Sequence, residues 1–155
     1  NGDTSTPTAL ILLPSEHHEP ACRKRLQSGS QRRLHRSRFD ENPDVILVAS
    51  GSEVSTLVAG AELLRKDGIK LRIVSAPSEG LFRNQAPGYQ ESIIPANAKV
   101  FGLTAGLPVT LEGLVGAHGK VWGLESFGFS APYKVLDEKL GFTAENVYKQ
   151  VKAMM

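Results

Sequence analysis

A glycine–serine turn after an apolar run is the first feature of the chain that could do chemistry. Gly51 and Ser52 follow the β-branched run of residues 45–50 and precede a pattern typical of a helix. Backbone N–H groups at a helix N-terminus bind phosphate and similar anions, so Gly51 and Ser52 are an anion-binding candidate. The glycine fingerprint of dinucleotide sites is absent. A plain strand-to-helix turn is therefore the favoured interpretation, and the anion site is the weaker hypothesis.

Histidine and carboxylate side chains are further candidates for catalysis. His118 is the only histidine after residue 43, and no acid or nucleophile lies near it in the sequence. Glu112 and Glu125 have the chemistry of general acids and bases. Carboxylates are far more often surface groups, however. These residue types therefore predict no catalytic centre in this chain.

An aromatic segment, Ser126-Phe-Gly-Phe-Ser-Ala-Pro132, stands near the end of the chain. Gly128 allows a sharp backbone turn, and Phe127 and Phe129 flank it. One interpretation is an ordinary loop whose two rings fill the core. The favoured one is an interface, because exposed Phe129 and Tyr133 would leave apolar surface uncovered in the isolated chain. The candidate interface residues are His118, Phe127, Gly128, Phe129, Ser130 and Pro132.

The elements that must position these residues alternate between strand and helix patterns. Residues 45–50 form a β-branched apolar run, typical of a strand covered on both faces. Ser52 is a candidate N-cap for a helix that ends in Arg65-Lys66 before Asp67-Gly68. Residues 70–75 are the next strand, which completes a right-handed βαβ unit.

The rest of the chain continues the alternation. Strands are expected over residues 99–104 and 120–124, and helices over residues 89–94, 109–115 and 133–140 and after the candidate cap Thr143. Trp122 is expected in the core. The pattern predicts a three-layer α/β fold: an open, mostly parallel sheet of about five strands with helices on both faces.

Composition restricts the class of protein. The net charge of +2 is unevenly distributed: residues 1–39 carry seven Lys and Arg against three Asp and Glu, and residues 40–155 carry eleven against thirteen. The basic part lacks the aromatic platform or recognition helix of a nucleic-acid-binding segment.

His17, His18 and Cys22 could begin a metal site, but a fourth ligand and a compact scaffold are missing. One cysteine, no long apolar run and no signal-peptide pattern indicate a cytoplasmic protein with no membrane partner.

Several blocks in consistent order resemble the C-terminal domain of transketolases, over about residues 43–155. The Phe-Gly-x-Ser-Ala-Pro pattern favours transketolases over the related dihydroxyacetone synthases and deoxyxylulose-phosphate synthases. The blocks are Pro43-Asp-Val-Ile-Leu-Val-Ala-Ser-Gly-Ser-Glu-Val54, Gly68-Ile-Lys-Leu-Arg-Ile-Val-Ser-Ala-Pro-Ser78, Tyr89-Gln-Glu-Ser-Ile-Ile-Pro95, Phe127-Gly-Phe-Ser-Ala-Pro132 and Leu140-Gly-Phe-Thr-Ala-Glu-Asn-Val147.

The resemblance implies a parent enzyme of the pentose phosphate pathway. Such an enzyme moves a two-carbon ketol unit from a ketose phosphate to an aldose phosphate with thiamine diphosphate and Mg²⁺. The residues that bind this cofactor belong to other domains of the family, so we expect neither a cofactor site, a metal site nor catalysis in this chain alone. The resemblance also places the segment 126–132 and the region of His118 at domain or subunit boundaries. The expected partners are the missing transketolase domains or a second copy of the chain, and no nucleic acid.

Two alternatives remain open. One is a free-standing regulatory module that binds a small anion where the parallel strands end, as open α/β sheets commonly do. The other is one subunit of a split transketolase, whose partner chain would supply the cofactor-binding domains.

The N-terminal part differs from the rest. Thr6-Pro-Thr-Ala-Leu-Ile-Leu12 resembles the last strand of the preceding, pyrimidine-binding domain, so residues 1–12 are interpreted as its remnant. Residues 13–42 are interpreted as an irregular basic linker, expected to be disordered, and residues 43–155 as the transketolase C-terminal domain.

The sequence after Leu12 suggests a frameshift. The family continues there with Ser-Arg-Gln-Asn, whereas this chain continues with Leu13-Pro-Ser-Glu-His-His18. Removing one base from codons for Leu-Ser-Arg-Gln-Asn-Ile gives that Leu-Pro-Ser-Glu-His-His sequence. The hypothesis is that residues 13–38 are a frameshifted reading of the gene, restored near Phe39. Sequencing the source gene tests it, because an uninterrupted frame that encodes this segment would contradict it.

Overall fold

The structure is a computed structural model that describes residues 10–12 and 42–155. The frameshift hypothesis for residues 13–38, the linker 13–42 apart from its last residue, and the metal-ligand candidates His17, His18 and Cys22 lie outside the described residues. They stay predictions from the sequence.

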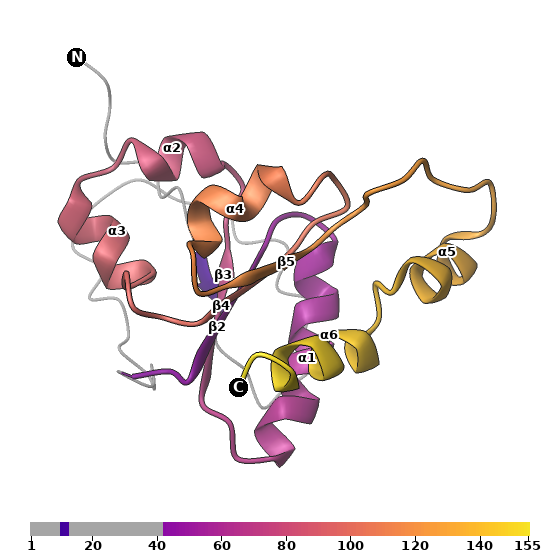
Figure 1. Cartoon of the computed structure of the whole chain (residues 1–155), viewed down its shortest axis with the longest axis horizontal. Helices are drawn as coiled ribbons and strands as arrows, with labels where there is room; N and C mark the ends of the chain where they lie inside the picture. Colours follow the sequence, from indigo (N-terminus) through magenta and orange to yellow (C-terminus); the bar gives the residue numbers. More distant parts are fainter. Residues whose placement is uncertain (1–9, 13–41) are drawn as a thin grey trace, which may run out of the picture.

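Within the described residues, five strands form one sheet in the order β1-β3-β2-β4-β5 (Figure 1). β2 pairs in parallel with β3 and β4, and β4 pairs in parallel with β5. β1 pairs antiparallel with β3, with Leu10 opposite Ser75. β1 therefore closes one edge of this sheet, while the assignment of residues 1–12 to a preceding domain stays a prediction. The strands are β1 Leu10–Leu12, β2 Val45–Ala49, β3 Leu71–Ser75, β4 Val100–Leu103 and β5 Lys120–Trp122.

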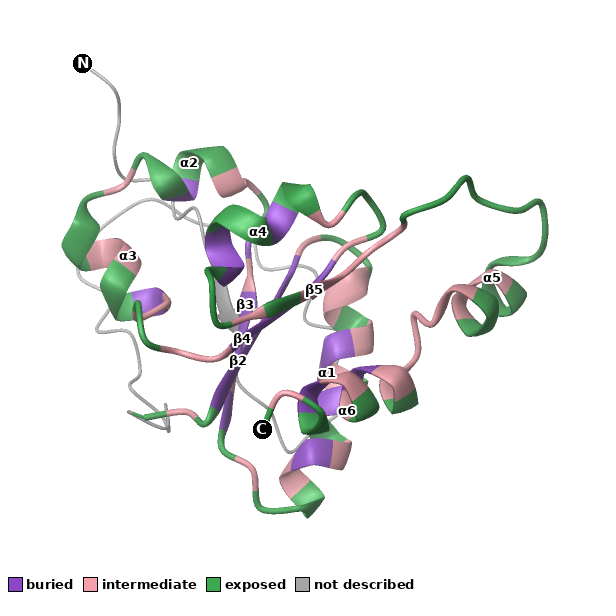
Figure 2. Ribbon diagram, viewed as in Figure 1, coloured by how far each residue is buried: buried purple, intermediate pink, exposed green. Residues whose placement is uncertain are grey.

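Helices cover both faces of the sheet, which confirms the expected three-layer α/β fold. Alternate residues of β2 point to opposite faces: Leu47 packs in a cluster with residues of α1 and α6, and Val48 packs in a cluster with residues of α2, α3 and α4. Figure 2 shows the buried residues concentrated in the central strands and in the helix sides that face them. The helices are α1 Glu53–Lys66, α2 Glu79–Arg83, α3 Pro87–Ile93, α4 Val109–Val115, α5 Tyr133–Leu140 and α6 Ala144–Lys152.

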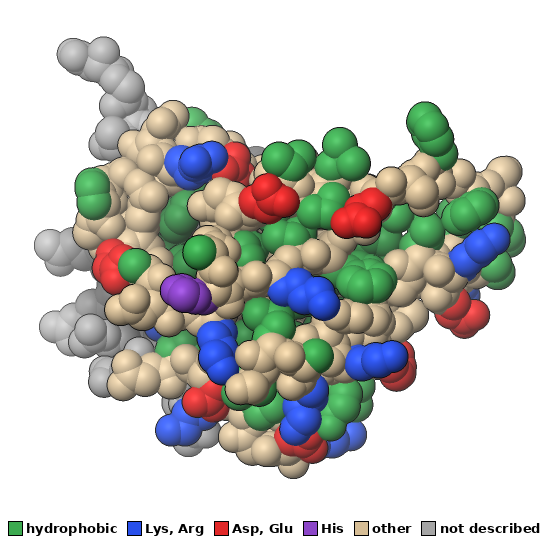
Figure 3. Space-filling model, viewed as in Figure 1, with side chains coloured by type: hydrophobic (Ala, Val, Ile, Leu, Met, Phe, Trp, Pro, Cys, Tyr) green, Lys and Arg blue, Asp and Glu red, His purple; other side chains and the backbone are tan. Residues whose placement is uncertain are grey.

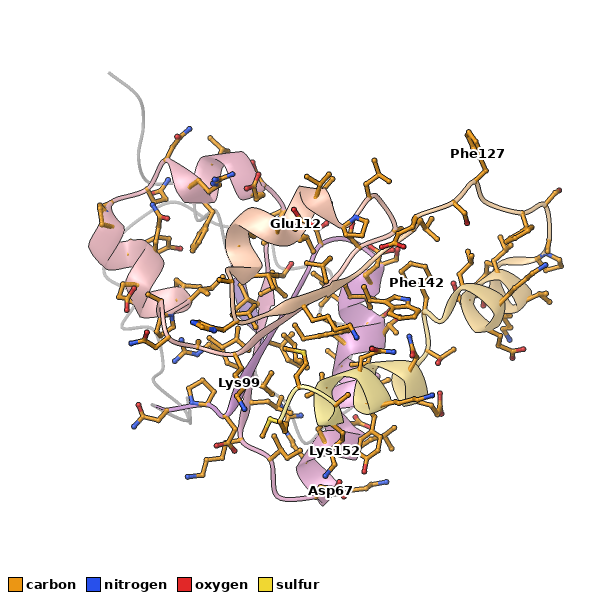
Figure 4. All side chains as sticks on the ribbon, in the orientation of Figure 1. Asp67, Lys99, Glu112, Phe127, Phe142 and Lys152 are labelled. Carbon is orange, nitrogen blue, oxygen red and sulfur yellow. The ribbon has the colours of Figure 1, made fainter. Side chains whose placement is uncertain are left out.

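Helices α1 and α6 form the most extensive helix–helix contact of the described residues. Gly60 of α1 lies against Val147 of α6, and a Cβ at position 60 would come within 2.6 Å of the Val147 Cγ1 atom. At the end of α1, the Asp67 carboxylate accepts hydrogen bonds from the Tyr148 hydroxyl at 2.7 Å and from Lys152 Nζ at 2.9 Å. Figure 4 shows Asp67 and Lys152 side by side where α1 ends.

Several expected details hold and others differ. The Thr143 hydroxyl caps α6 by accepting a hydrogen bond from the Asn146 N–H at 3.2 Å, as the sequence predicts. Ser52 stands at the N-cap position of α1, but its side chain does not cap the helix. Helix α2, which begins after the capping residue Ser78, was not expected from the sequence. No helix in the described part of the chain is long and apolar enough to cross a membrane.

Candidate functional site

A hollow opens where β4 and β5 end. The loops that follow these strands are tied together, because the Leu124 N–H donates to the Gly106 carbonyl at 2.9 Å and the Thr104 N–H donates to the Trp122 carbonyl at 3.0 Å. The hollow has a volume of about 420 Å³ and is lined by residues 105–107 and 124–127. Most of this lining is apolar, and its one ionisable side chain is that of Glu125.

The aromatic rings of the candidate interface segment are exposed. Phe127 is 96% exposed, Tyr133 69% and Phe129 50%. Phe127 points away from the body of the molecule in Figure 4. The alternative interpretation, in which these rings fill the core, is therefore wrong. An exposed ring of this size beside an apolar hollow is typical of a surface that contacts another protein or domain.

The backbone of this segment differs from the expected form. It bends at Ser126, Ser130 and Ala131 rather than at Gly128. Gly128 is not among the glycines with a positive φ, and a Cβ there would meet open space. The sequence predicted a sharp turn at Gly128 because glycine permits one, but nothing lies within 4 Å of a Cβ at this position to impose it. The segment instead extends away from the body to α5 (Figure 1).

Helix α5 is held to the domain at its C-terminal end. The indole N–H of Trp122 donates to the Leu140 carbonyl at 3.1 Å, and the Asn146 side-chain amide donates to the Gly141 carbonyl at 2.8 Å. Gly141 has a φ of 78°, and a Cβ there would lie 2.8 Å from the Asn146 amide nitrogen, so this helix end requires glycine. No residue of α5 is buried. Lys139 Nζ lies 3.9 Å from the centre of the Phe129 ring, which links the helix to the loop before it.

The other candidates lie elsewhere. Exposed His118 lies in the turn before β5, at the opposite end of that strand from the aromatic segment, so the structure does not bring His118 and the segment together.

At the anion candidate, Gly51 has a φ of 64° and the Ser52 hydroxyl donates to the Glu53 carboxylate at 2.9 Å. A bound anion would meet this carboxylate. Residues 10–12 and 42–155 contain no cluster of three metal-ligating side chains.

Two exposed apolar residues of this surface were not predicted from the sequence. Leu107 is 59% exposed and lines the hollow, and Val109 at the start of α4 is 64% exposed. The sequence around them is rich in glycine and has no regular apolar period, so no pattern marked them. Figure 3 shows acidic side chains beside exposed hydrophobic ones along this upper edge of the molecule.

Comparisons with known proteins agree on one family. A family profile described as the transketolase-like C-terminal domain matches residues 33–143. The transketolase of Staphylococcus aureus strain MW2 is 36% identical over 162 aligned residues, which cover 97% of this chain and 23% of that protein. The chain thus spans about a quarter of the length of the curated relatives it matches.

Solved structures give the same fold. A transketolase from Leishmania mexicana superposes with a TM-score of 0.67 and 33% identity, over 73% of this chain and 16% of that one. A structure described as a split-gene transketolase in an inactive β4 tetramer superposes with a TM-score of 0.58 and 19% identity, over 74% of this chain and 40% of that one. The latter similarity extends to the fold alone.

Proposed function

The chain belongs to the transketolase C-terminal domain family, and we propose on that premise that it is the structural, interface-forming domain of a transketolase. The whole enzyme would transfer a two-carbon ketol unit between ketose and aldose phosphates in the cytoplasm. This chain alone would not catalyse that reaction. Its role would be to support the neighbouring domains, which carry the chemistry.

The described residues do not fit thiamine diphosphate or its metal ion. A diphosphate needs cations or clustered N–H donors, yet the one ionisable group lining the hollow is the Glu125 carboxylate. The metal ion needs several oxygen ligands, and the described part of the chain lacks a cluster that could supply them. We therefore assign the cofactor to domains outside this chain and derive no catalytic step here.

The exposed rings of Phe127, Phe129 and Tyr133 are the observation that carries the proposal. An aromatic side chain buries 150–250 Å² when it is fully enclosed, and each Å² of apolar surface removed from water contributes about 25 cal/mol of free energy. A domain that functioned alone would be more stable if such rings were covered. Their presence on one protruding segment supports an interface with another domain or subunit. The family assignment supports transketolase domains as the natural neighbours.

A reconstitution assay tests this function. The purified chain is assayed for ketol transfer with thiamine diphosphate, Mg²⁺, a ketose phosphate and an aldose phosphate, alone and mixed with a transketolase truncated before its C-terminal domain. We expect no turnover by the chain alone, and a rise in the melting temperature or activity of the truncated enzyme when the chain is added. Turnover by the chain alone would overturn the structural role.

The free-standing anion-binding module is less well supported, because the carboxylates of Glu53 and Glu125 lie at the two places where an anion was expected. An increase in the melting temperature of the chain on adding phosphate would support the anion-binding module.

The split-transketolase alternative has the β4 tetramer as a structural neighbour of the same fold. In that case a separate chain bearing the cofactor domains would restore activity in the reconstitution assay.

A further inference from the structure

We propose that the segment between β5 and α5 is a proteolytic cleavage site, and that the cut domain stays folded as a complex of two pieces. The bond that is cut joins Phe127 to Gly128, and the protease is one whose specificity pocket accepts an aromatic side chain. Water adds across this amide: its oxygen bonds to the Phe127 carbonyl carbon and the C–N bond breaks, which leaves a carboxylate on Phe127 and an ammonium group on Gly128. The inference concerns the free chain and does not rest on the proposed interface role.

The segment has the exposure that a protease needs. Residues 125–135 are exposed without interruption, which is the longest such run within residues 42–155. The chain leaves the body of the molecule here (Figure 1), and the labelled Phe127 ring points away from it in Figure 4. Exposed loop tips are the preferred sites of proteolytic nicking, whereas a cut inside a packed element first requires local unfolding.

The backbone of the segment can pair with a protease without losing bonds of its own. Among the described residues, no backbone–backbone hydrogen bond involves residues 125–131. The Phe127 carbonyl accepts a side-chain hydrogen bond from the Ser126 hydroxyl at 3.4 Å. An extended peptide that binds by strand addition gains its affinity from main-chain hydrogen bonds. This segment can therefore form them in the folded state.

Phe127 is the more accessible of the two phenylalanines in the segment. Its side chain is 96% exposed, whereas Phe129 is 50% exposed and has Lys139 Nζ 3.9 Å from the centre of its ring. A protease pocket for aromatic residues must enclose the ring, and the Phe127 ring can enter such a pocket with little loss of contact to the domain. A Cβ at Gly128 would meet nothing within 4 Å, so the bond after Phe127 is unobstructed.

The two pieces should remain associated, because helix α6 lies on the C-terminal side of the cut and packs against the rest of the domain. Val147 and Val151 of α6 are fully buried in the cluster that contains residues of α1 and the central strands. Burial from water is the main source of such stability. Hydrogen bonds also join the two pieces at Lys99 and Met155, Lys120 and Gln150, Trp122 and Leu140, Asp67 and Tyr148, and Asp67 and Lys152. None of these contacts involves the segment, so the cut breaks none of them.

Limited proteolysis of the full chain with chymotrypsin, which has an apolar pocket for aromatic side chains, tests the site. Mass spectrometry follows the fragment that begins at Gly128 and ends at Met155. We expect this fragment to appear at least about tenfold faster than fragments cut after Phe82 or Phe101, because both of these phenylalanines are buried and become accessible only when the domain opens.

A pair of variants makes the test specific. Phe127→Ser removes the ring that enters the protease pocket and should slow the appearance of the fragment about tenfold or more. The matched control is Val109→Ser, which changes an exposed apolar residue outside the segment and should leave the rate unchanged.

Size-exclusion chromatography of the cut chain tests the association of the two pieces. They should elute together in buffer and separately in concentrated urea. Val151→Ala removes buried methyl groups from α6 and should increase the fraction of the C-terminal piece that is released on dilution. Circular dichroism verifies that each variant is folded, and Tyr148→Phe, which loses the hydrogen bond to Asp67, replaces Val151→Ala if that one is not.

Three results would each overturn the inference. They are the absence of an early fragment that begins at Gly128, an unchanged rate in Phe127→Ser, and a cut chain whose pieces separate in buffer.

Discussion

Phe127 and Phe101 show how differently the same side chain can contribute to this protein. Phe101 in β4 is fully buried, whereas Phe127 is 96% exposed. Burial from water supplies most of the stabilisation that an aromatic side chain can give, so only Phe101 supports the fold. Phe127 is free to serve contacts outside the domain.

Substitution separates the two roles. Phe127→Ser should change the free energy of unfolding by about 0.5 kcal/mol or less, because no buried contact is lost. The control Phe101→Ala should cost about 3–5 kcal/mol. Urea unfolding at a concentration where the chain is monomeric measures both. A large loss of stability in Phe127→Ser would mean that its ring packs within the domain after all.

Asp67 gives the stability of the domain a predictable dependence on pH. Hydrogen bonds from Lys152 and then from Tyr148 lower the pKa of the Asp67 carboxyl below its ordinary value of 3.8. Because folding lowers the pKa of this carboxyl, its hydrogen bonds stabilise the folded state fully at pH values above the pKa of the unfolded chain. This stabilisation is lost as the pH falls through the pKa of the folded state. The same hydrogen bonds raise the pKa values of Lys152 and Tyr148, so their contribution is lost again in strongly alkaline solution.

The variant Asp67→Asn should expose this dependence. The difference in unfolding free energy between wild type and variant should be constant near neutral pH and shrink below about pH 4, where the carboxyl protonates. Thermal or urea unfolding across pH 2–8 gives the comparison. A difference that grew as pH fell would contradict the assignment.

At the level of elements, the packing of α1 on α6 depends on Gly60. Alanine would raise the helix propensity of α1 by about 1 kcal/mol, but its Cβ would lie only 2.6 Å from Val147 Cγ1. Overpacking of this kind costs about 1–3 kcal/mol. Gly60→Ala should therefore destabilise the domain on balance.

Two further variants make that prediction specific. Gly80→Ala in α2 is the matched control, because a Cβ there meets nothing within 4 Å, so helix propensity alone should act and the variant should be no less stable than the wild type. Adding Val147→Ala to Gly60→Ala removes Cγ1, the Val147 atom nearest to the added Cβ, and should make the alanine at position 60 less costly. Equal effects of Gly60→Ala and Gly80→Ala on the unfolding midpoint would show that the helices can move apart freely.

The elements themselves were predictable from the sequence to the extent that a local pattern encodes them. Helix α4 occupies the expected residues 109–115, and β2 follows the β-branched run that predicted it. Helix α2 was missed because five residues are too few to show a helical period. The bends at Ser126, Ser130 and Ala131 were missed for another reason. Gly128 permits a turn without requiring one, and the sequence does not show that no other residue packs against this glycine.

For the whole molecule, the candidate surface could be predicted only in part. The aromatic segment was identifiable because its two phenylalanines flank a glycine outside any periodic pattern. The hollow beside it was not, since it results from two loops brought together by β4 and β5, which are neighbours in the sheet. His118 and the segment belong to one set of interface candidates in the sequence, but β5 separates the two in the structure. Residues that flank a strand are close in the sequence but lie at opposite ends of the strand in the structure.

The edges of the sheet bear on how this domain behaves outside a larger enzyme. β1 occupies the outer side of β3, and the opposite edge is β5, a strand of only three residues whose exposed Lys120 is held by Gln150. The short β5 edge, which carries a lysine, is a poor template for adding a foreign strand. The β5 edge should therefore resist the addition of a further strand even where no other domain covers it.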